Sequence, residues 1–307
     1  MRYLVTGAGG FIGSYLVDEL ISTGAEVCAS IRKHPTGLAV HDRLIIITGD
    51  VLNRDYVARV IGEFKPDCVF HLAAQTLQAP SWEDPEATFA LNVTGTLNVL
   101  DAIRGMTKPA RLIMACSSSE YGWQTDPIPE TAPFLPASPY AASKVAADHL
   151  VRLYHARYGL PTIRAYPFFW IGPRKTGDVC SDLARGIVDI EQGRRQVLDV
   201  GNLSAVRDFL DVRDGVAALR LLAEKGLSGE AYNVCSGRGR SIAEMLNIMK
   251  QAAHVPITER VDNQRLRPLD EPIKVGNCDK LSGLGWKPQF PVEKTVEAIL
   301  DYWRAQY

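Results

Sequence analysis

The sequence predicts an α/β protein with a doubly wound parallel sheet and a smaller C-terminal lobe. Three observations support this fold class. Short apolar segments alternate with amphipathic helical segments through the first half of the chain. A glycine-rich motif lies between the first expected strand and the first expected helix. After about residue 165 the alternation gives way to irregular sequence rich in Pro, Gly and Arg.

The alternating segments can be placed along the chain from their periodicity. The apolar run TyrLeuVal at 3–5 indicates a buried strand, and the amphipathic residues 14–21 indicate the helix that follows it. We expect strands near 2–6, 25–30, 44–48, 67–71, 110–116 and 161–166, and helices near 11–23, 53–63, 85–105 and 139–158. Such alternation produces a parallel sheet with helices on both faces, and ligands bind at the carboxyl ends of its strands.

The change in pattern suggests a division into two domains. Residues 1–166 are expected to form the cofactor-binding domain, with segments at about 207–235 and 273–285 returning to it. Residues 167–307 are expected to form mainly the substrate-binding lobe, which is built largely from 167–206 and 236–275.

Bulk composition narrows the class of protein. An apolar content of 46% over 307 residues is typical of a globular chain, and a net charge of −1 provides no basic surface for nucleic acid. There is no run of 18 apolar residues and no signal peptide, since the first strand begins at Tyr3. The sequence predicts no metal site, and its scattered cysteines indicate reduced core residues of a cytoplasmic protein: Cys28, Cys68, Cys116, Cys180, Cys235 and Cys278.

The glycine motif predicts a site for a dinucleotide. Gly7, Gly10 and Gly13 are spaced to give a tight turn, a close approach to a pyrophosphate and close helix–strand packing, as in Rossmann-type domains. The start of the following helix offers amide donors and the positive end of its dipole to the phosphates.

Tyr140 and Lys144 are the candidate proton-transfer pair. They lie four residues apart in SerProTyrAlaAlaSerLys (138–144), so a helix places them on one face, one turn from each other. The Lys144 ammonium is expected to lower the pKa of the Tyr140 phenol, because a nearby opposite charge favours the ionised form. Such a phenol can protonate a carbonyl oxygen during hydride transfer.

These motifs occur in an order that resembles a known family. Gly7-x-x-Gly10-x-x-Gly13, Asp50-Val51, HisLeuAlaAla (71–74), Asn92, the serines at 117–119 and Tyr140-x-x-x-Lys144 resemble the extended short-chain dehydrogenases that act on nucleotide sugars. Segments 201–214, 232–237, 266–268 and 285–288 most resemble the reductases that convert GDP-4-keto-6-deoxy-mannose to GDP-rhamnose. The GDP-mannose 4,6-dehydratases are close neighbours of these reductases.

The resemblance implies a set of cofactor contacts: Gly7, Gly10, Phe11, Ile12, Gly13, Arg32, Asp50, Val51, Leu72, Ala73, Ala74, Asn92, Tyr140 and Lys144. An acidic residue at the end of the second strand would bind the ribose of NAD. This strand is instead followed by Arg32 and Lys33, which favours NADP.

The serine run bears on the type of reaction. By resemblance, Ser117 hydrogen-bonds the reacting sugar oxygen, and Ser118, Ser119 and Glu120 lie beside the substrate. Many 4,6-dehydratases carry a glutamate, the base for water elimination, where this chain has Ser119. Glu120 is one residue further on, and in an extended segment it would face the opposite way. The sequence therefore favours reduction or 4-epimerisation over dehydration.

The nucleotide end of the substrate has its own candidates by resemblance. Arg207 and Arg267 match phosphate-binding arginines, and Asp270 stands where relatives carry a ribose-binding glutamate. Val179 and Asn202 match positions along the same groove. Phe169 replaces a family asparagine that contacts the sugar, so either sugar placement or sugar identity is expected to differ.

Together these features predict an NADPH-dependent enzyme, most simply a reductase of the C4 ketone of GDP-4-keto-6-deoxy-D-mannose that forms GDP-D-rhamnose. In that reaction hydride passes from NADPH to C4, Tyr140 protonates the oxygen, and Ser117 and Lys144 assist. The alternatives are a nucleotide-sugar 4-epimerase, a GDP-mannose 4,6-dehydratase, or a non-enzymatic NADP-binding sensor on the same fold. The resemblance also implies a homodimer formed through the helix that bears Tyr140.

Overall fold

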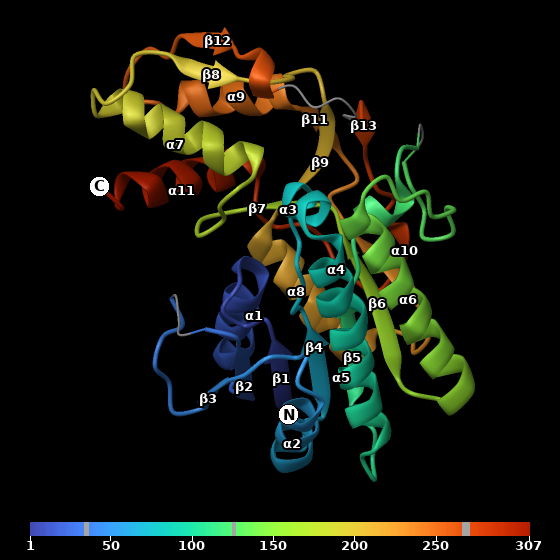
Figure 1. Ribbon diagram of the computed structural model, residues 1–307. Coiled ribbons are helices and arrows are strands. Elements are labelled where there is room, and N and C mark those ends of the chain that lie inside the picture. Colours follow the sequence, from blue (N-terminus) through green and yellow to red (C-terminus); the bar gives the residue numbers. More distant parts are fainter. Residues whose placement is uncertain (34–36, 125–126, 266–270) are drawn as a thin grey trace.

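A seven-stranded parallel sheet forms the centre of the computed structural model, which describes residues 1–33, 37–124, 127–265 and 271–307 (Figure 1). Its strand order is β10-β6-β5-β4-β1-β2-β3, and every neighbouring pair is parallel. The strands are β1 (Arg2–Thr6), β2 (Glu26–Ile31), β3 (Leu44–Thr48), β4 (Cys68–His71), β5 (Arg111–Ala115), β6 (Thr162–Pro167) and β10 (Ala231–Val234). The order reverses beside β1, so β1 and β4 form the crevice in which such sheets bind ligands.

Helices cover both faces of this sheet. On one face α1 (Phe11–Ser22) and α8 (Val212–Lys225) pack with the sheet around Leu16, Leu20 and Leu219. On the other face α2 (Arg54–Phe64), α5 (Gly95–Arg104) and α6 (Pro139–Tyr158) share a second core. The predicted fold class is therefore confirmed, and the six strands expected before residue 167 are all present.

Local sequence explains where the helix that bears Tyr140 begins and ends. Ser138 caps α6 by accepting the Ala141 amide at 3.1 Å, and Pro139 follows at the first helical position. Gly159 ends the helix with φ +67°, a conformation that glycine adopts without strain. These signals fix the register of α6 and with it the direction of Tyr140.

The helix expected at 85–105 is present from 85 to 104, but a π-helical turn interrupts its α-helical geometry. The chain forms α3 (Gln78–Glu83) and α4 (Pro85–Phe89), then a π-helical turn at Ala90–Thr94, and only then α5. The wider π turn shifts the helix face at Asn92, whose side chain is buried and fully engaged, as described below. The sequence pattern did not reveal this break because the apolar spacing continues through it.

A smaller lobe stands above the carboxyl ends of the strands (Figure 1). Its core lies between α7 (Val179–Glu191), α9 (Ile242–Gln251) and α11 (Val292–Arg304), and β8 (Leu198–Val200) pairs with β12 (Glu259–Val261). A second sheet joins the two lobes: β9 (Val206–Asp211) pairs with β7 (Phe169–Ile171), β11 (Gly239–Ser241) and β13 (Ile273–Lys274). Three short elements complete the described fold: 3₁₀ turns at Ser118–Tyr121 and Asn263–Arg265, and α10 (Asp279–Ser282).

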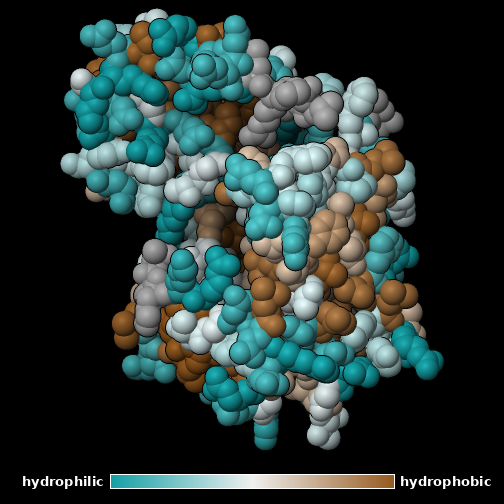
Figure 2. All heavy atoms as spheres, viewed as in Figure 1, coloured by the Kyte–Doolittle hydropathy of each residue, from teal (hydrophilic) through white to brown (hydrophobic). Residues whose placement is uncertain are grey.

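The two lobes leave a hollow between them, which is visible in the space-filling view (Figure 2). The carboxyl ends of β1, β4 and β5 lie at this junction (Figure 1). Within the described residues, no helix is both long and apolar enough to cross a membrane.

Candidate active site

The glycine motif forms a tight turn between β1 and α1. Gly7 has φ +70°, and a methyl group there would come within 2.7 Å of the Ala73 amide nitrogen. A methyl group at Gly13 would come within 2.3 Å of the Gly7 carbonyl oxygen, so Gly13 lets α1 pack against the turn. Gly10 is the exposed N-cap of α1. These roles are the ones that a dinucleotide-binding turn requires.

The first turn of α1, all of which the structure describes, is suited to an anion. Gly10 has no side chain to cap the helix, and the turn carries no acidic residue. Its amides therefore remain available for a phosphate. Phe11 and Ile12, the next two predicted contacts, are half-buried at this helix start.

The other predicted cofactor residues lie at the carboxyl ends of the neighbouring strands. Thr6 ends β1, and it binds the residues after β4: its carbonyl accepts the Leu72 amide at 3.2 Å and its hydroxyl the Ala73 amide at 3.3 Å. Asp50 accepts the Leu52 amide at 2.9 Å after β3. The remaining predicted contacts there are Val51, which is buried, Ala74, which is half-buried, and Arg32, which is exposed after β2.

Asn92 ties two of these elements together. Its Oδ1 accepts the Gln75 amide at 2.8 Å, and its Nδ2 donates to the Ser143 hydroxyl at 2.9 Å. The π turn thus links the loop after β4 to the helix that carries Tyr140 and Lys144. In this structure Asn92 therefore binds the backbone of the loop after β4, which contains predicted cofactor contacts.

The structure brings Ser117, Tyr140 and Lys144 together. Each side chain is less than a tenth exposed. The Ser117 hydroxyl is close enough to the Tyr140 phenol to lower its pKa, and the Lys144 ammonium donates to the carbonyl of Ala115 at the end of β5. The predicted one-turn spacing of Tyr140 and Lys144 on α6 is confirmed.

The expected electrostatic effect of Lys144 on Tyr140 is not borne out in this structure. Burial raises the pKa of Tyr140 to about 12, partly offset by the neighbouring Ser117 hydroxyl. Burial also lowers the pKa of Lys144, against the attraction of Cys116, Glu120 and Asp148. Desolvation of the phenol therefore exceeds any effect of the ammonium, which is directed to a backbone carbonyl. Sequence spacing could not reveal this, because it carries no information on burial.

The serine run does not have the extended conformation that was expected from the sequence. Ser118–Tyr121 form a 3₁₀ turn that Ser117 caps, accepting the Ser119 amide at 3.1 Å. Glu120 completes a capping box by accepting the Ser117 amide at 2.7 Å. Ser118 is buried, Ser119 is half-buried and Glu120 is wholly buried. The turn, and not strand alternation, directs Glu120 inward.

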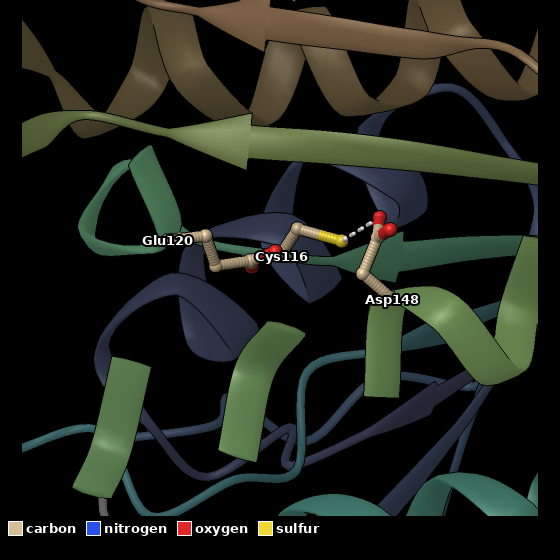
Figure 3. Close-up of side chains that lie close together, drawn as sticks. All are labelled: Cys116, Glu120 and Asp148. Atoms are coloured by element: carbon tan, nitrogen blue, oxygen red, sulfur yellow. Dashed lines mark hydrogen bonds between the residues drawn. The ribbon is translucent and has the colours of Figure 1, made fainter. Parts of the chain in front are cut away.

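Glu120 lies in a buried polar cluster with Cys116 and Asp148 (Figure 3). The Asp148 carboxylate binds the Tyr166 hydroxyl at 2.5 Å and the Arg164 guanidinium at 3.2 Å, and it accepts weakly from the Cys116 thiol at 3.6 Å. The second carboxyl oxygen of Glu120 has no partner among the described residues. Burial, and then the charge of Asp148, raise the pKa of Glu120 well above its usual range.

The donor atoms of this cluster lie within 4.8 Å of one another, which is close enough to consider a metal ion. The groups that face them argue otherwise. Lys144 and Arg164 already supply positive charge to the cluster, and a protonated Glu120 is a poor ligand. The cluster is better described as a buried group in which Lys144 and Arg164 offset the charge of the carboxyl groups.

The structure describes four of the six remaining predicted substrate residues. Phe169 stacks edge-on against Phe209, at 5.6 Å between ring centres, at the lobe junction. Asn202 accepts two bonds from Ser204, and Val179 begins α7; both are half-buried. Arg207 is nearly buried and donates to the Glu271 carbonyl at 2.7 Å. Arg267 and Asp270 lie outside the described residues.

Comparison with known proteins identifies the family. The sequence profile described as GDP-mannose 4,6 dehydratase matches residues 4–299. The chain belongs to this family of extended short-chain dehydrogenases. It is 32% identical to the GDP-6-deoxy-D-mannose reductase of Pseudomonas aeruginosa, over 99% of this chain and 98% of that one. It is 31% identical to the UDP-glucose 4-epimerase of Streptomyces lividans, over 98% and 95% of the two chains.

Solved structures agree with this assignment. The structure of RMD from Pseudomonas aeruginosa complexed with NADPH matches with a TM-score of 0.87 at 31% identity, over the full length of both chains. The UDP-glucose 4-epimerase of Thermus thermophilus, complexed with NAD, matches with a TM-score of 0.90 at 30% identity, also over both full lengths.

Two lysines near the lobe junction, Lys175 and Lys274, were not among the site residues predicted from the sequence. The Lys175 ammonium pairs with Asp178 at 2.7 Å and lies 5.4 Å from the ring centres of both Phe11 and Phe169. It therefore connects the start of α1 to the second sheet. Lys274 lies opposite Arg207 in the β9–β13 pairing and is buried. The ArgLys pair after GlyPro was a visible signal for Lys175, whereas only the strand pairing reveals Lys274.

Proposed function

We propose that this protein reduces the C4 ketone of a nucleotide-linked 4-keto-6-deoxy sugar, with GDP-4-keto-6-deoxy-D-mannose as substrate and GDP-D-rhamnose as product. The observation that carries the proposal is the inward position of Glu120 beside an intact set of Ser117, Tyr140 and Lys144. The set can support a proton transfer, while the Glu120 carboxyl is directed into the cluster with Cys116 and Asp148. The relative in Pseudomonas aeruginosa named as a GDP-6-deoxy-D-mannose reductase supports the same choice.

The chain is an NAD(P)-dependent oxidoreductase by its family, and NADPH is the cofactor of the proposed reaction. The turn at Gly7 and the uncapped start of α1 fit a dinucleotide, because a side chain at either point would occupy the space or the amides that it needs. Arg32, exposed at the end of β2, supports recognition of the 2′-phosphate. The RMD protein of Pseudomonas aeruginosa, which shares this fold, forms a complex with NADPH.

The residues divide the work of the reduction. When bound, NADPH supplies the hydride that adds to C4 of the sugar. The Tyr140 hydroxyl protonates the oxygen, and its raised pKa keeps it in the protonated form that an acid needs. The Ser117 hydroxyl lies beside Tyr140, and the capping box fixes Ser117 in turn. Lys144, buried on the same face of α6, adds positive charge as the alkoxide develops.

A 4-epimerase is the second candidate function. Two observations favour it: the 31% identity to the Streptomyces lividans enzyme and the TM-score of 0.90 with the Thermus thermophilus epimerase. A 4,6-dehydratase finds less support, because Glu120 is wholly buried in the capping box. A non-enzymatic sensor would not require Ser117, Tyr140 and Lys144 to be brought together.

The ratio of NADPH oxidised to sugar converted distinguishes these functions. The protein would be incubated with NADPH and enzymatically prepared GDP-4-keto-6-deoxy-D-mannose, while nicotinamide absorbance and sugar product are followed together. A reductase oxidises about one NADPH for each sugar converted, because its cycle does not regenerate the reduced cofactor. Continued turnover of a UDP-hexose without net NADPH loss would instead establish the epimerase. A 4-keto-6-deoxy product from GDP-mannose would establish the dehydratase and contradict the role given to Glu120.

We further propose a cytoplasmic homodimer that forms through α6. Leu153 and Tyr158, on α6, are about half exposed or more, and Figure 2 places apolar side chains over this side of the molecule. All six cysteines are unpaired, as suits a reducing compartment. Sedimentation of the wild-type chain and of Leu153→Glu tests the dimer: the variant should be monomeric, and a monomeric wild type would contradict it.

A further inference from the structure

Two cysteines from distant parts of the chain lie against each other near the lobe junction. Cys235 follows β10, and Cys278 immediately precedes α10. A methyl group at Gly276 would come within 2.6 Å of the Cys235 sulfur, and one at Gly237 would lie 3.4 Å from the Cys278 sulfur. Each sulfur therefore rests on the segment that carries the other. The two thiols also interact electrostatically, and each shifts the pKa of the other.

The backbone around both cysteines is fixed by one carboxylate. Asp208, buried in β9, accepts the Ser236 amide at 2.7 Å, the Gly237 amide at 3.0 Å and the Gly276 amide at 3.2 Å. Just beyond, the Asn233 side chain donates to the Asn277 carbonyl at 3.1 Å. The separation of the two thiols is thus set by the fold and not by the rotamer of one exposed side chain.

The two thiols differ in the way that thiol–disulfide exchange requires. Cys278 is partly exposed, and its interaction with the Cys235 thiol lowers its pKa to about 7, so a large share is thiolate near neutral pH. Cys235 is wholly buried, and its pKa is raised. Burial raises the pKa of each of the other four thiols, which keeps them unreactive: Cys28, Cys68, Cys116 and Cys180.

We propose that Cys235 and Cys278 form a thiol–disulfide site that reacts with low-molecular-weight disulfides of the glutathione type. The Cys278 thiolate attacks one sulfur of the small disulfide, forms a mixed disulfide and releases one small thiolate. The Cys235 thiol then gives up its proton and attacks the Cys278 sulfur, which releases the second small thiolate. In sum the protein dithiol is oxidised to one disulfide, and one small disulfide is reduced to two thiols.

The position of the site connects it to the candidate substrate groove. Cys278 ends the segment in which the Glu271 carbonyl holds Arg207 and Lys274 lies opposite Arg207. A disulfide between Cys235 and Cys278 would link this segment covalently to β10 of the large sheet. The site is independent of the proposed reaction, because it uses none of Ser117, Tyr140 or Lys144.

The decisive experiment treats the folded, unmodified chain with glutathione disulfide, alkylates the remaining thiols and maps them by mass spectrometry. We expect a peptide pair linked through Cys235 and Cys278, with two glutathione thiols released per chain and the other four cysteines alkylated. Cys235→Ser should trap glutathione on Cys278, whereas Cys278→Ser should leave Cys235 unmodified. Cys180→Ser, which changes a buried cysteine of the smaller lobe, should keep the link.

A second measurement needs no variant. The rate at which iodoacetamide alkylates Cys278 in the native chain should rise with pH around a midpoint near 7. A midpoint near 8.5, the ordinary value for a free cysteine, would contradict the effect of Cys235 on Cys278. Glutathione that stays on Cys278 of the wild-type chain, or a link that forms only in denaturant, would overturn the proposal.

Discussion

The Tyr140 hydroxyl receives opposing influences from its neighbours. Burial raises its pKa most, the neighbouring Ser117 hydroxyl lowers it, and the charges of Glu120 and Cys116 raise it further. Glu120 also holds the Ser117 amide, so one carboxyl affects both the position and the proton affinity of the catalytic pair. The sequence alone predicted which residues meet here but not their charge balance, because the balance follows from burial.

Glu120→Gln separates these two effects. The amide oxygen can still accept the Ser117 amide. At the alkaline pH at which Tyr140 ionises, however, the negative charge with which Glu120 raises the pKa of Tyr140 is absent from the variant. A reduction needs Tyr140 protonated, so activity falls as pH rises through that pKa. We therefore expect the basic limb of the kcat/KM profile for ketone reduction to move to lower pH, while the acidic limb stays in place.

Two variants control this prediction. Glu130→Gln changes another carboxyl that accepts a backbone amide, that of Asn233 at 2.9 Å, and it should leave the limb unmoved. Tyr140→Phe should lose about 10²–10⁴-fold in turnover and the basic limb with it. A Glu120→Gln profile identical to that of the wild type would show that this carboxyl carries no charge that Tyr140 feels.

At the scale of elements, the sequence predicted what periodicity encodes. Strands of five or six residues and the amphipathic helices expected in the first half were placed within one or two residues, but the periodicity revealed neither α3 nor the π turn at 90–94. The three-residue strands β7, β8, β11 and β12 are too short to show a period, and long-range pairing alone creates them. The inward turn of Glu120 did have a signal, because Ser-x-x-Glu at 117–120 is the sequence of a capping box.

The end of β2 gives a prediction about cofactor choice. Arg32 is exposed there, free of burial costs, where a 2′-phosphate would lie. A charge-assisted contact of about 1.5–3 kcal/mol corresponds to a loss of roughly 10–150-fold in NADPH affinity for Arg32→Ala. NADH affinity should hardly change. Fluorescence titration with both cofactors measures this, and Arg54→Ala, an exposed arginine on α2, is the control. Equal losses for the two cofactors would mean that Arg32 does not read the phosphate.

At the scale of the whole molecule, Asp208 holds the lobes in register. Its carboxylate gathers the turn after β10 and the segment after β13 onto β9. In Asp208→Asn the amide nitrogen would face at least one of these backbone donors, leaving it buried and unpaired. The free energy of unfolding should fall by about 1–3 kcal/mol for each such donor.

Denaturant unfolding at fixed pH measures this loss. Asp199→Asn is the matched control, because Asp199 pairs with exposed Arg260 on β12, and such surface pairs contribute less than about 1 kcal/mol. If the two variants lose equal stability, Asp208 is not the junction described.

The strand order also bears on how the chain must be made. β10 closes the outer edge of the sheet by pairing with β6, yet its residues are synthesised long after β6, once much of the smaller lobe has been translated. Until residues 231–234 leave the ribosome, β6 has a row of unpaired amides and carbonyls along that edge. A nascent chain stalled before β10 would thus expose an aggregation-prone edge. Expression of a fragment such as 1–166 would carry the same exposed edge permanently.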